Sequence, residues 1–425
     1  MRNSASLDGG ALLNLVDIAT EKLDDYLPLI TREQADKLRD LSERLKGHRI
    51  LHVNATPYGG GVSELLRSAL ALQRGLGLAV DWRVIAGETK FFEVTKRFHN
   101  ALQGAPYELP EEDRDTYLLQ NSFNAHQFGH DYDLVIIHDP QPVPLLQMHG
   151  RGYAKWAWRC HIDTSEPNRT VLDFLKPYID EYDALIFTLD KFVPDDLRDH
   201  KIKLIPPGID PLSPKNFDLT PEQCRRIMSW VGVDPSRPVL TQVSRFDPWK
   251  DPLGVIRIFR EARKQVPGLQ LALLGSMALD DPEAWDLMAE IREESNGDDD
   301  ILVSTNLTGI GNMEVNVFQR SSDVVVQKSI REGFGLIVSE TLWKGTSMVA
   351  GNTGGIPIQM PAGTGGYLVD PHDEDMMAER AVELLRDPAL RKQLGASGRE
   401  VVRENFLITR YVIDELELLA DMANV

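Results

Sequence analysis

The stretch VVVQKSIREGFGLIVSE, residues 324–340, is the part of the sequence that most clearly indicates the fold. Its first residues, 324–327, are mainly β-branched and uncharged, which predicts a buried strand. A turn that contains Gly333 and Gly335 follows, and residues 336–343 predict a helix. Glycines between a strand and a helix let backbone N–H groups approach a ligand, so this turn is a candidate binding site.

The same alternation of apolar strands and amphipathic helices occurs in both halves of the chain. Near-continuous apolar strands of this kind are typical of parallel sheets that helices cover on both faces. The sequence therefore predicts an α/β protein with two doubly wound, Rossmann-like domains. The expected strands are 49–55, 80–86, 134–138, 155–162, 184–188 and 202–205 in the first half, and 239–244, 269–274, 301–304, 324–327, 347–350 and 366–369 in the second.

Two prolines and a glycine at positions 206–208 predict a linker over about 206–216, because proline cannot continue a strand or a helix. Ligands of open α/β sheets bind at the carboxyl ends of the strands, so we expect the two domains to face a central cleft. The predicted parts are a helical N-terminal extension (1–47), a first domain (48–210), a second domain (216–400) and a C-terminal helix (401–425) that packs back on the first domain.

Composition excludes several classes of function. Lys and Arg number 46 against 65 Asp and Glu, and the formal charge of −19 argues against a nucleic-acid surface. Cys160 and Cys224 are the only cysteines and lack CxxC spacing, which favours a reducing cytoplasm over a disulfide framework. No apolar run is long enough to span a membrane, so no membrane partner is expected. A homodimer is the default expectation for assembly.

A glycine cluster, Gly59 to Gly61, follows the first predicted strand and precedes a predicted helix. The backbone at Gly60 and Gly61 can approach an anion or a polar sugar at the start of that helix. The spacing is neither GxGxxG nor that of a phosphate-binding loop, so it does not predict a nucleotide site. A plain tight turn is the alternative interpretation.

Two cations, Arg245 and Lys250, lie near the end of the first strand of the second half, on either side of Pro248. A diphosphate leaving group needs opposed positive charge, which an arginine and a lysine at a strand end can supply. Two unrelated surface cations are the alternative interpretation.

Two carboxylates, Glu332 and Glu340, are eight residues apart, one in the glycine turn and one on the helix that follows. They can bracket a sugar nucleotide, with one carboxylate on the sugar hydroxyls and the other on a ribose. The alternative is one carboxylate at a helix terminus and one with a structural role. A further glycine turn at residues 353–357 can line the same site.

Two strand ends in the first half carry a histidine close to a carboxylate. His161 is followed by Asp163, and a histidine in this place can position a reacting sugar hydroxyl. His138 and Asp139 close another strand, where they can form a polar acceptor pocket. Neither pair has metal-ligand spacing, and a structural histidine is the alternative.

Together these motifs resemble those of retaining glycosyltransferases with the GT-B fold. The Glu-x7-Glu pattern of Glu332 and Glu340, the cations Arg245 and Lys250, the glycine loop and His161 occur in the order typical of that family. The resemblance covers residues from about 48 to 425. The strings HIDTS (161–165) and DPWKDP (247–252) and residues 328–335 are more similar to one branch, the trehalose synthases and trehalose phosphorylases.

The resemblance implies transfer of glucose between a nucleoside diphosphate glucose and a second glucose, giving α,α-trehalose reversibly. It implies that Arg245 and Lys250 hold the diphosphate and that Glu340 holds the ribose. It also implies that His161 lies near the anomeric carbon and that the loop at Gly60 and Gly61 approaches the phosphate or acceptor. The donor glucose would be held by Glu332 and by the backbone of Gly333, Phe334, Gly335 and Leu336.

The implied mechanism retains the anomeric configuration by front-face attack, and it needs no metal and no further cofactor because the two cations neutralise the diphosphate. The expected partners are small-molecule sugars and a nucleotide sugar. Three alternatives stay open: a trehalose phosphorylase that releases glucose 1-phosphate, a GT-B transferase with another sugar acceptor, and a sugar-nucleotide-binding sensor without turnover.

Overall fold

The computed structural model describes residues 13–129, 131–277 and 282–425. These residues divide into two compact units. The N-terminal unit contains the described residues up to Leu27, residues 31–206 and residues 412–425. The C-terminal unit contains residues 28–30 and 207–411.

A seven-stranded sheet of order β1-β3-β2-β4-β5-β6-β7 forms the centre of the N-terminal unit. Every pair of neighbouring strands is parallel except β1 with β3. Its inner strands are buried almost throughout, as the apolar sequences predict. The strands are β1 (Asn14–Leu15), β2 (Arg49–Asn54), β3 (Ala79–Val84), β4 (Leu134–His138), β5 (Lys155–Arg159), β6 (Ala184–Phe187) and β7 (Ile202–Leu204).

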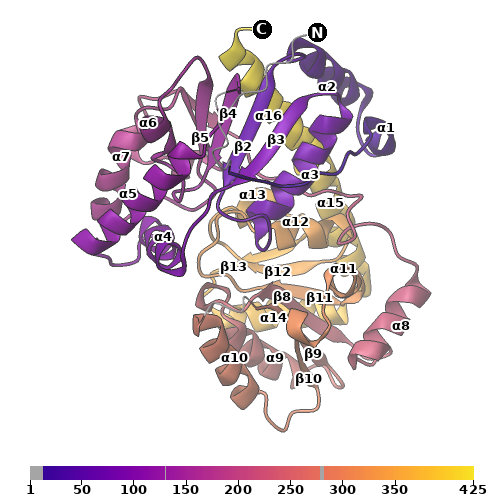
Figure 1. Cartoon of the computed structure of the whole chain (residues 1–425). Helices are drawn as coiled ribbons and strands as arrows, with labels where there is room; N and C mark the ends of the chain where they lie inside the picture. Colours follow the sequence, from indigo (N-terminus) through magenta and orange to yellow (C-terminus); the bar gives the residue numbers. More distant parts are fainter. Residues whose placement is uncertain (1–12, 130, 278–281) are drawn as a thin grey trace. The chain divides into compact units, whose positions relative to one another are not determined.

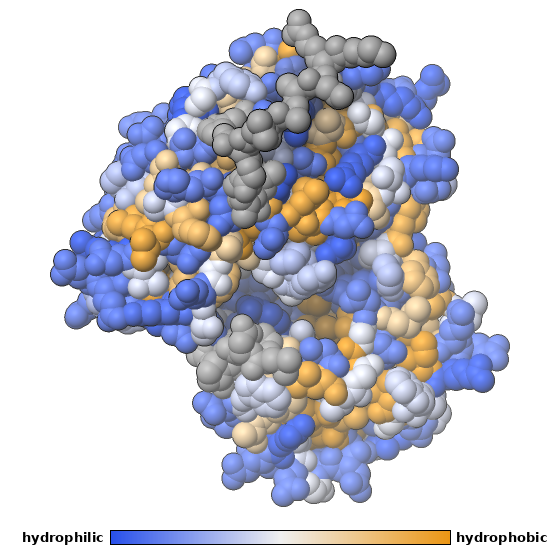
Figure 2. Space-filling view, in the orientation of Figure 1, coloured by the Kyte–Doolittle hydropathy of each residue, from blue (hydrophilic) through white to orange (hydrophobic). Residues whose placement is uncertain are grey.

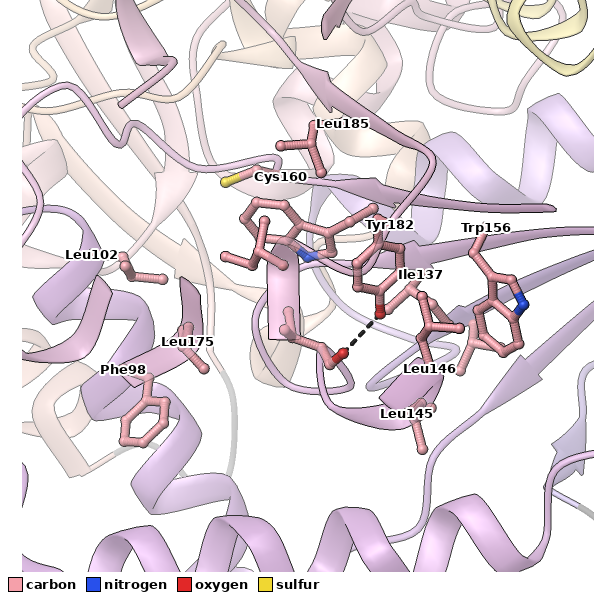
Figure 3. Packing of buried hydrophobic residues seen from close by; sticks show 14 of the residues in the cluster. Phe98, Leu102, Ile137, Leu145, Leu146, Trp156, Cys160, Leu175, Tyr182 and Leu185 are labelled. Atoms are coloured by element: carbon pink, nitrogen blue, oxygen red, sulfur yellow. Dashed lines mark hydrogen bonds between the residues drawn. The ribbon is translucent and has the colours of Figure 1, made fainter. Parts of the chain in front are cut away.

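Helices cover both faces of this sheet, with α4 to α7 on one side and α2, α3 and α16 on the other (Figure 1). The core on the first side contains aromatic and aliphatic residues of β4, β5, α4 and α7, some of which Figure 3 shows. The helices are α1 (Leu23–Tyr26), α2 (Arg32–Arg44), α3 (Gly61–Gly75), α4 (Thr89–Leu102), α5 (Glu111–His126), α6 (Leu145–His149), α7 (Arg169–Ile179) and α16 (Ile408–Ala423), with 3-10 turns at Asp190–Phe192 and Asp195–Leu197.

The C-terminal unit has a six-stranded, fully parallel sheet of order β10-β9-β8-β11-β12-β13. Its strands are β8 (Val239–Arg245), β9 (Gln270–Ser276), β10 (Ile301–Thr305), β11 (Val324–Gln327), β12 (Met348–Gly351) and β13 (Gly366–Val369). Its helices are α8 (Pro221–Val231), α9 (Pro252–Arg263), α10 (Pro282–Glu294), α11 (Asn312–Ser321), α12 (Leu336–Trp343), α13 (Ile356–Gln359), α14 (Glu374–Arg386) and α15 (Pro388–Asn405), with 3-10 turns at Pro248–Lys250 and Asn306–Thr308.

Each sheet has one point where the order of the strands reverses. In the N-terminal unit β3 lies on one side of β2 and β4 on the other, and in the C-terminal unit β9 and β11 flank β8 in the same way. Loops that leave such neighbouring strands diverge and create space for ligands at the carboxyl ends. The candidate residues of both units follow β2, β4, β5, β8 and β11.

The structure confirms the predicted α/β class with two doubly wound parallel sheets. The twelve predicted strands are all present, mostly within two residues of their expected ends. The largest difference is β5, which ends at Arg159 and leaves His161 in the loop beyond it. The N-terminal segment, which we expected to be helical, also contains the short strand β1, and residues 401–425 include the end of α15 as well as α16.

Hydrophilic side chains spread over most of the face drawn in Figure 2, with hydrophobic side chains between them. Within the described parts of the chain, no helix combines the length and the hydrophobicity that a membrane span requires. Cys160 and Cys224 are both buried and neither forms a disulfide.

The buried Tyr182 hydroxyl, which donates to the backbone carbonyl of Val143 at 2.8 Å (Figure 3), allows a test of this core. Tyr182→Phe removes the donor and leaves that carbonyl without it in an apolar region, so we expect a loss of about 1–2 kcal/mol in the free energy of unfolding. Urea denaturation measures the loss. Tyr153→Phe, at a side chain that is 72% exposed, is the matched control and should change stability by less than about 0.5 kcal/mol.

Candidate active-site residues in each unit

An ion pair between Lys250 and Glu332 is the central contact of the C-terminal unit's strand-end residues. The Lys250 ammonium lies 2.5 Å from Oε2 of Glu332, and the two side chains are 14% and 11% exposed. Lys250 is on the 3-10 turn that follows β8, whereas Glu332 is in the loop that follows the neighbouring strand β11. The sheet therefore brings together two residues that are distant in sequence.

The loops on either side of this pair are held rigidly. The Asp247 carboxylate accepts from the Trp249 N–H at 2.9 Å and caps the turn that carries Lys250. The backbone N–H of Ile330 donates to the Trp249 carbonyl at 2.8 Å, which joins the two loops directly. The Ser329 hydroxyl donates to Glu332 Oε2 at 3.1 Å. Lys250 and Glu332 are thus positioned before any ligand arrives.

The predicted glycine turns pack on the backbone of Glu332. A Cβ on Gly354 would lie 1.6 Å from the Glu332 carbonyl oxygen, so only glycine permits this approach. Gly335 has a φ of 84° and sits against the Glu332 side chain, where a Cβ would lie 3.2 Å from Cγ. The turn therefore places the backbone of 333–336 at the N-terminus of α12, where N–H groups can bind an anion or hydroxyl.

Arg245 is the exposed member of the predicted cation pair. It is the last residue of β8, its side chain is 61% exposed, and its guanidinium lies 3.1 Å from Asp247. The structure therefore places one half-buried cation, Lys250, and one solvent-accessible cation on the same short segment. This arrangement can neutralise an incoming diphosphate from two directions.

Glu340 lies on α12 and is almost fully buried. Its Oε2 accepts from the Gln319 amide at 2.9 Å, and its Oε1 is 3.3 Å from the Lys215 ammonium. Lys344, one turn along the helix, donates to the Glu340 carbonyl at 2.9 Å, and burial lowers the pKa of this lysine to about 7. Glu340 thus has its own polar partners, Gln319 and Lys215.

In the N-terminal unit the structure brings together Asp139 and His161. The backbone N–H of His161 donates to Oδ1 of Asp139 at 2.9 Å. Asp139 has a φ of 64° directly after β4, and its carbonyl accepts from the Trp158 indole at 2.9 Å. Burial of the carboxyl group raises the pKa of Asp139 to about 6. The carboxylate therefore holds the loop that carries His161.

His138 joins this contact, because its Nδ1 lies 2.9 Å from Nε2 of His161, whereas Asp163, Gly60 and Gly61 have local roles. The Asp163 carboxylate accepts from the Ser165 N–H at 3.0 Å and from its hydroxyl at 2.6 Å, and so closes a local turn. Gly60 caps α3 with a φ of 83°, and a Cβ there would meet nothing within 4 Å. Glycine is needed here for the backbone conformation, and the space next to Gly60 is open. Gly61 is the first residue of α3.

Several polar residues around these groups were not singled out from the sequence. His52 and Arg159 lie inside buried strands, and Glu415 lies on the buried face of α16. His52 had a recognisable signal, because it is a lone histidine with apolar neighbours on both sides in a predicted strand. Glu415 and Gln319 had none, because a single polar residue on a helix is usually solvent-exposed.

Both the fold and the sequence place the chain in a known class of enzyme. Trehalose-6-phosphate synthase has a solved structure that superposes with a TM-score of 0.72 at 16% identity, covering 89% of this chain and 99% of that one. The family profile described as "Glycosyl transferases group 1" matches residues 226–401. The protein is a glycosyltransferase with the GT-B fold.

The relatives define the family more closely. The profile described as "Trehalose synthase, N-terminal domain" matches residues 52–194. Trehalose synthase of Rubrobacter xylanophilus is 49% identical, covering 97% of this chain and all of the relative, and that of Pyrococcus horikoshii is 44% identical, covering 94% and 96%. The chain belongs to the trehalose synthase family. Trehalose phosphorylase of Pleurotus pulmonarius is more distant, at 28% identity over 95% of this chain and 61% of the relative.

The raised pKa of Asp139 predicts a pH-dependent effect of Asp139→Asn. An asparagine can keep the bond to the His161 N–H and does not ionise. The wild-type carboxyl has a pKa of about 6 when folded and about 3.8 when unfolded. Its ionisation therefore lowers the free energy of unfolding progressively between those two pH values, and the full loss persists at higher pH. The variant should therefore gain on the order of 2–3 kcal/mol in unfolding free energy above pH 6 and almost nothing at pH 3.

Urea denaturation of Asp139→Asn and wild type at pH 7.5 and pH 3 measures this difference. The low-pH pair is the internal control, because the aspartate is then protonated in both the folded and the unfolded state. An equal gain in unfolding free energy at the two pH values would show that the gain comes from packing and not from the ionisation of Asp139.

Proposed function

We propose that the protein transfers glucose between a nucleoside diphosphate glucose and glucose, with retention at the anomeric carbon, and so makes α,α-trehalose reversibly. The observation that carries the donor side of this proposal is the Lys250–Glu332 pair at the switch point of the C-terminal sheet. Membership of the trehalose synthase family supports trehalose as the product.

A nucleotide sugar would use this pair in a specific way. In the absence of ligand the Lys250 charge is compensated by Glu332, so the ammonium costs less to bury than it would without a partner. A bound diphosphate supplies a stronger counter-charge for Lys250 and Arg245, which leaves the Glu332 carboxylate to accept hydrogen bonds from glucose hydroxyls. Negative charge that develops on the departing diphosphate is then met by cations that are already in place.

The proposed chemistry is metal-independent. Arg245 and Lys250 supply the positive charge that a divalent cation provides in many phosphate-transfer sites. The C1–O bond to the diphosphate breaks, the acceptor hydroxyl attacks the same face of the sugar, and the departing phosphate oxygen takes the acceptor's proton. By the family resemblance, His161 would position a hydroxyl of the glucose, and Asp139 holds the His161 backbone.

The overall reaction is tested by incubating the protein with trehalose and EDTA, adding UDP or ADP to one sample and phosphate to another. We expect nucleoside diphosphate glucose and free glucose from the first sample, read by chromatography. Glucose 1-phosphate from the second sample alone would make the protein a phosphorylase, and a requirement for Mg²⁺ would overturn the metal-independent mechanism. Donor binding without turnover would leave only a sensor.

Lys250→Ala tests the diphosphate site. Removing this preorganised charge should lower kcat/KM for the nucleotide sugar by about 10²–10³-fold, because the leaving group is then less well stabilised. The matched control is Lys264→Ala, which removes an exposed lysine that pairs with Glu261, three residues earlier on the surface of the same unit. A similar loss in both variants would contradict the assignment of Lys250.

Glu340→Gln tests the ribose role. If Glu340 accepts hydrogen bonds from a ribose, the variant should raise KM for the nucleotide about tenfold and change kcat little, since the ribose is distant from the reacting bond. The same variant should leave a phosphate-dependent reaction unaffected, because phosphate carries no ribose. An unchanged KM for the nucleotide would overturn the proposed role of Glu340.

A further inference from the structure

Three histidines of the N-terminal unit form a continuous line across its sheet. His52 lies in β2, His138 ends β4, and His161 follows β5. Nδ1 of His52 is 3.0 Å from Nε2 of His138, and Nδ1 of His138 is 2.9 Å from Nε2 of His161. The ring centroids are 5.3 and 5.2 Å apart. Each ring therefore hydrogen-bonds to the next.

The register of the sheet produces this line. His52 pairs with Ile136, so His138 is two residues further along the next strand, and His138 pairs with Arg159, so His161 is again two residues further. Side chains two residues apart point to the same face of a strand. Each step thus moves one strand across and one side-chain repeat toward the carboxyl end, and the line ends at the candidate site.

The two ends of the line carry opposite charges. At the inner end, Nε2 of His52 is 3.9 Å from the carboxylate of Glu415, which lies on α16 and also accepts from the Gln73 amide at 2.7 Å. At the outer end, the Nε–H of Arg159 donates to Nδ1 of His161 at 3.4 Å. Arg159 and Glu415 are both fully buried.

These end groups determine where the protons lie. An arginine can only donate, so Nδ1 of His161 must be unprotonated and Nε2 must carry the hydrogen. His161 then donates to Nδ1 of His138, and His138 donates from Nε2 to Nδ1 of His52. The remaining hydrogen, on Nε2 of His52, points toward the carboxylate of Glu415. If the hydrogens were on Nδ1 of each ring instead, the N–H of His161 would face the N–H of Arg159, and the unprotonated Nε2 of His52 would face the carboxylate of Glu415.

The rings are neutral in this arrangement. Burial, and then the neighbouring cation Arg159, keeps the pKa of His161 well below its usual range, and burial likewise lowers the pKa of His138 and His52. The charged groups that face the line are Arg159 from β5 and Glu415 from α16, while Asp139 binds the His161 backbone. A metal ion between the rings is sterically excluded, because two metal–nitrogen bonds of about 2 Å do not fit between nitrogens about 3 Å apart.

We propose that Glu415 and His52 are positioning residues that act through His138 to keep Nδ1 of His161 unprotonated, so that His161 meets a sugar hydroxyl as a hydrogen-bond acceptor. His161 is the half-buried member of the line, and its 3.4 Å bond from Arg159 is long enough for a hydroxyl to compete with it. When a sugar hydroxyl replaces Arg159 as the partner of Nδ1 of His161, Glu415 is the end group that still determines which nitrogen of each ring carries the hydrogen. The effect on catalysis rests on the proposed function, whereas the proton arrangement does not.

The proton arrangement can be read directly by two-bond ¹H–¹⁵N correlation spectra of the full chain with ¹⁵N-labelled histidine. Assignments come from variants that remove each histidine in turn. In the wild type, His52, His138 and His161 should all show an unprotonated Nδ1 and a protonated Nε2. Any other order in the wild type would overturn the proposal.

The dependence on Glu415 is tested with Glu415→Gln and, as an independent break in the line, His52→Phe. Each variant is combined with Arg159→Met, because Arg159 by itself keeps Nδ1 of His161 unprotonated. In that background both should shift the Nδ1 resonance of His161 toward its protonated position. The matched control is Glu417→Gln, on the same helix, which loses ion pairs with Lys37 and Lys203 instead of the contact with His52. This control should leave the His161 resonances unchanged. Unchanged resonances in both test variants would overturn the proposal.

Turnover provides the second readout. Glu415→Gln should lower kcat about tenfold with little change in KM for the donor and should shift the pH profile of kcat, whereas Glu417→Gln should stay within about twofold of the wild type. A lower kcat with an unchanged pH profile would indicate a merely structural role and overturn the proposal. If the wild type shows no transfer with any substrate, the proposed function fails, and the spectra still decide the inference.

Discussion

Both sheets are covered by helices on both faces, and this burial is the constraint on which the candidate sites depend. A polar side chain inside such a layer cannot reach water, so it must find a partner within the protein or lie beyond the end of its strand. Lys250 and Glu332 lie beyond the strand ends and pair with one another. His52 and Arg159 lie within the sheet of the N-terminal unit, and their hydrogen bonds lead to His138 and His161 at the carboxyl ends of its strands.

The two units use this constraint differently. In the C-terminal unit the glycine turns bring backbone against backbone, so that Gly354 packs on the Glu332 carbonyl and fixes the carboxylate next to Lys250. Rigidity comes there from close main-chain packing. In the N-terminal unit the order comes from hydrogen bonds, with Asp139 holding the His161 backbone and the histidine line holding its ring. Both devices place a polar group before a ligand arrives, which lowers the cost of binding.

Glu340 shows why a motif and its geometry have to be considered separately. Its spacing from Glu332 is the feature that most clearly marks the glycosyltransferase resemblance, yet its carboxylate is buried among Gln319, Lys215 and the chain around Lys344. Half of the motif is therefore an ion pair at a strand end, and the other half belongs to a buried polar cluster on α12. A nucleotide that uses both must exchange hydrogen bonds with that cluster.

Sequence alone determined the α/β class, the twelve main strands and the loops in which chemistry was to be expected, because hydrophobic periodicity and glycine turns are local properties. It also determined the class of enzyme, through motifs whose order is recognisable along the chain. Only the tertiary structure decided which side chains meet. The pairing of Lys250 with Glu332 depends on β8 lying next to β11, and the histidine line depends on strand register. Its anchoring by Glu415 depends on where a distant helix packs, which no local pattern encodes.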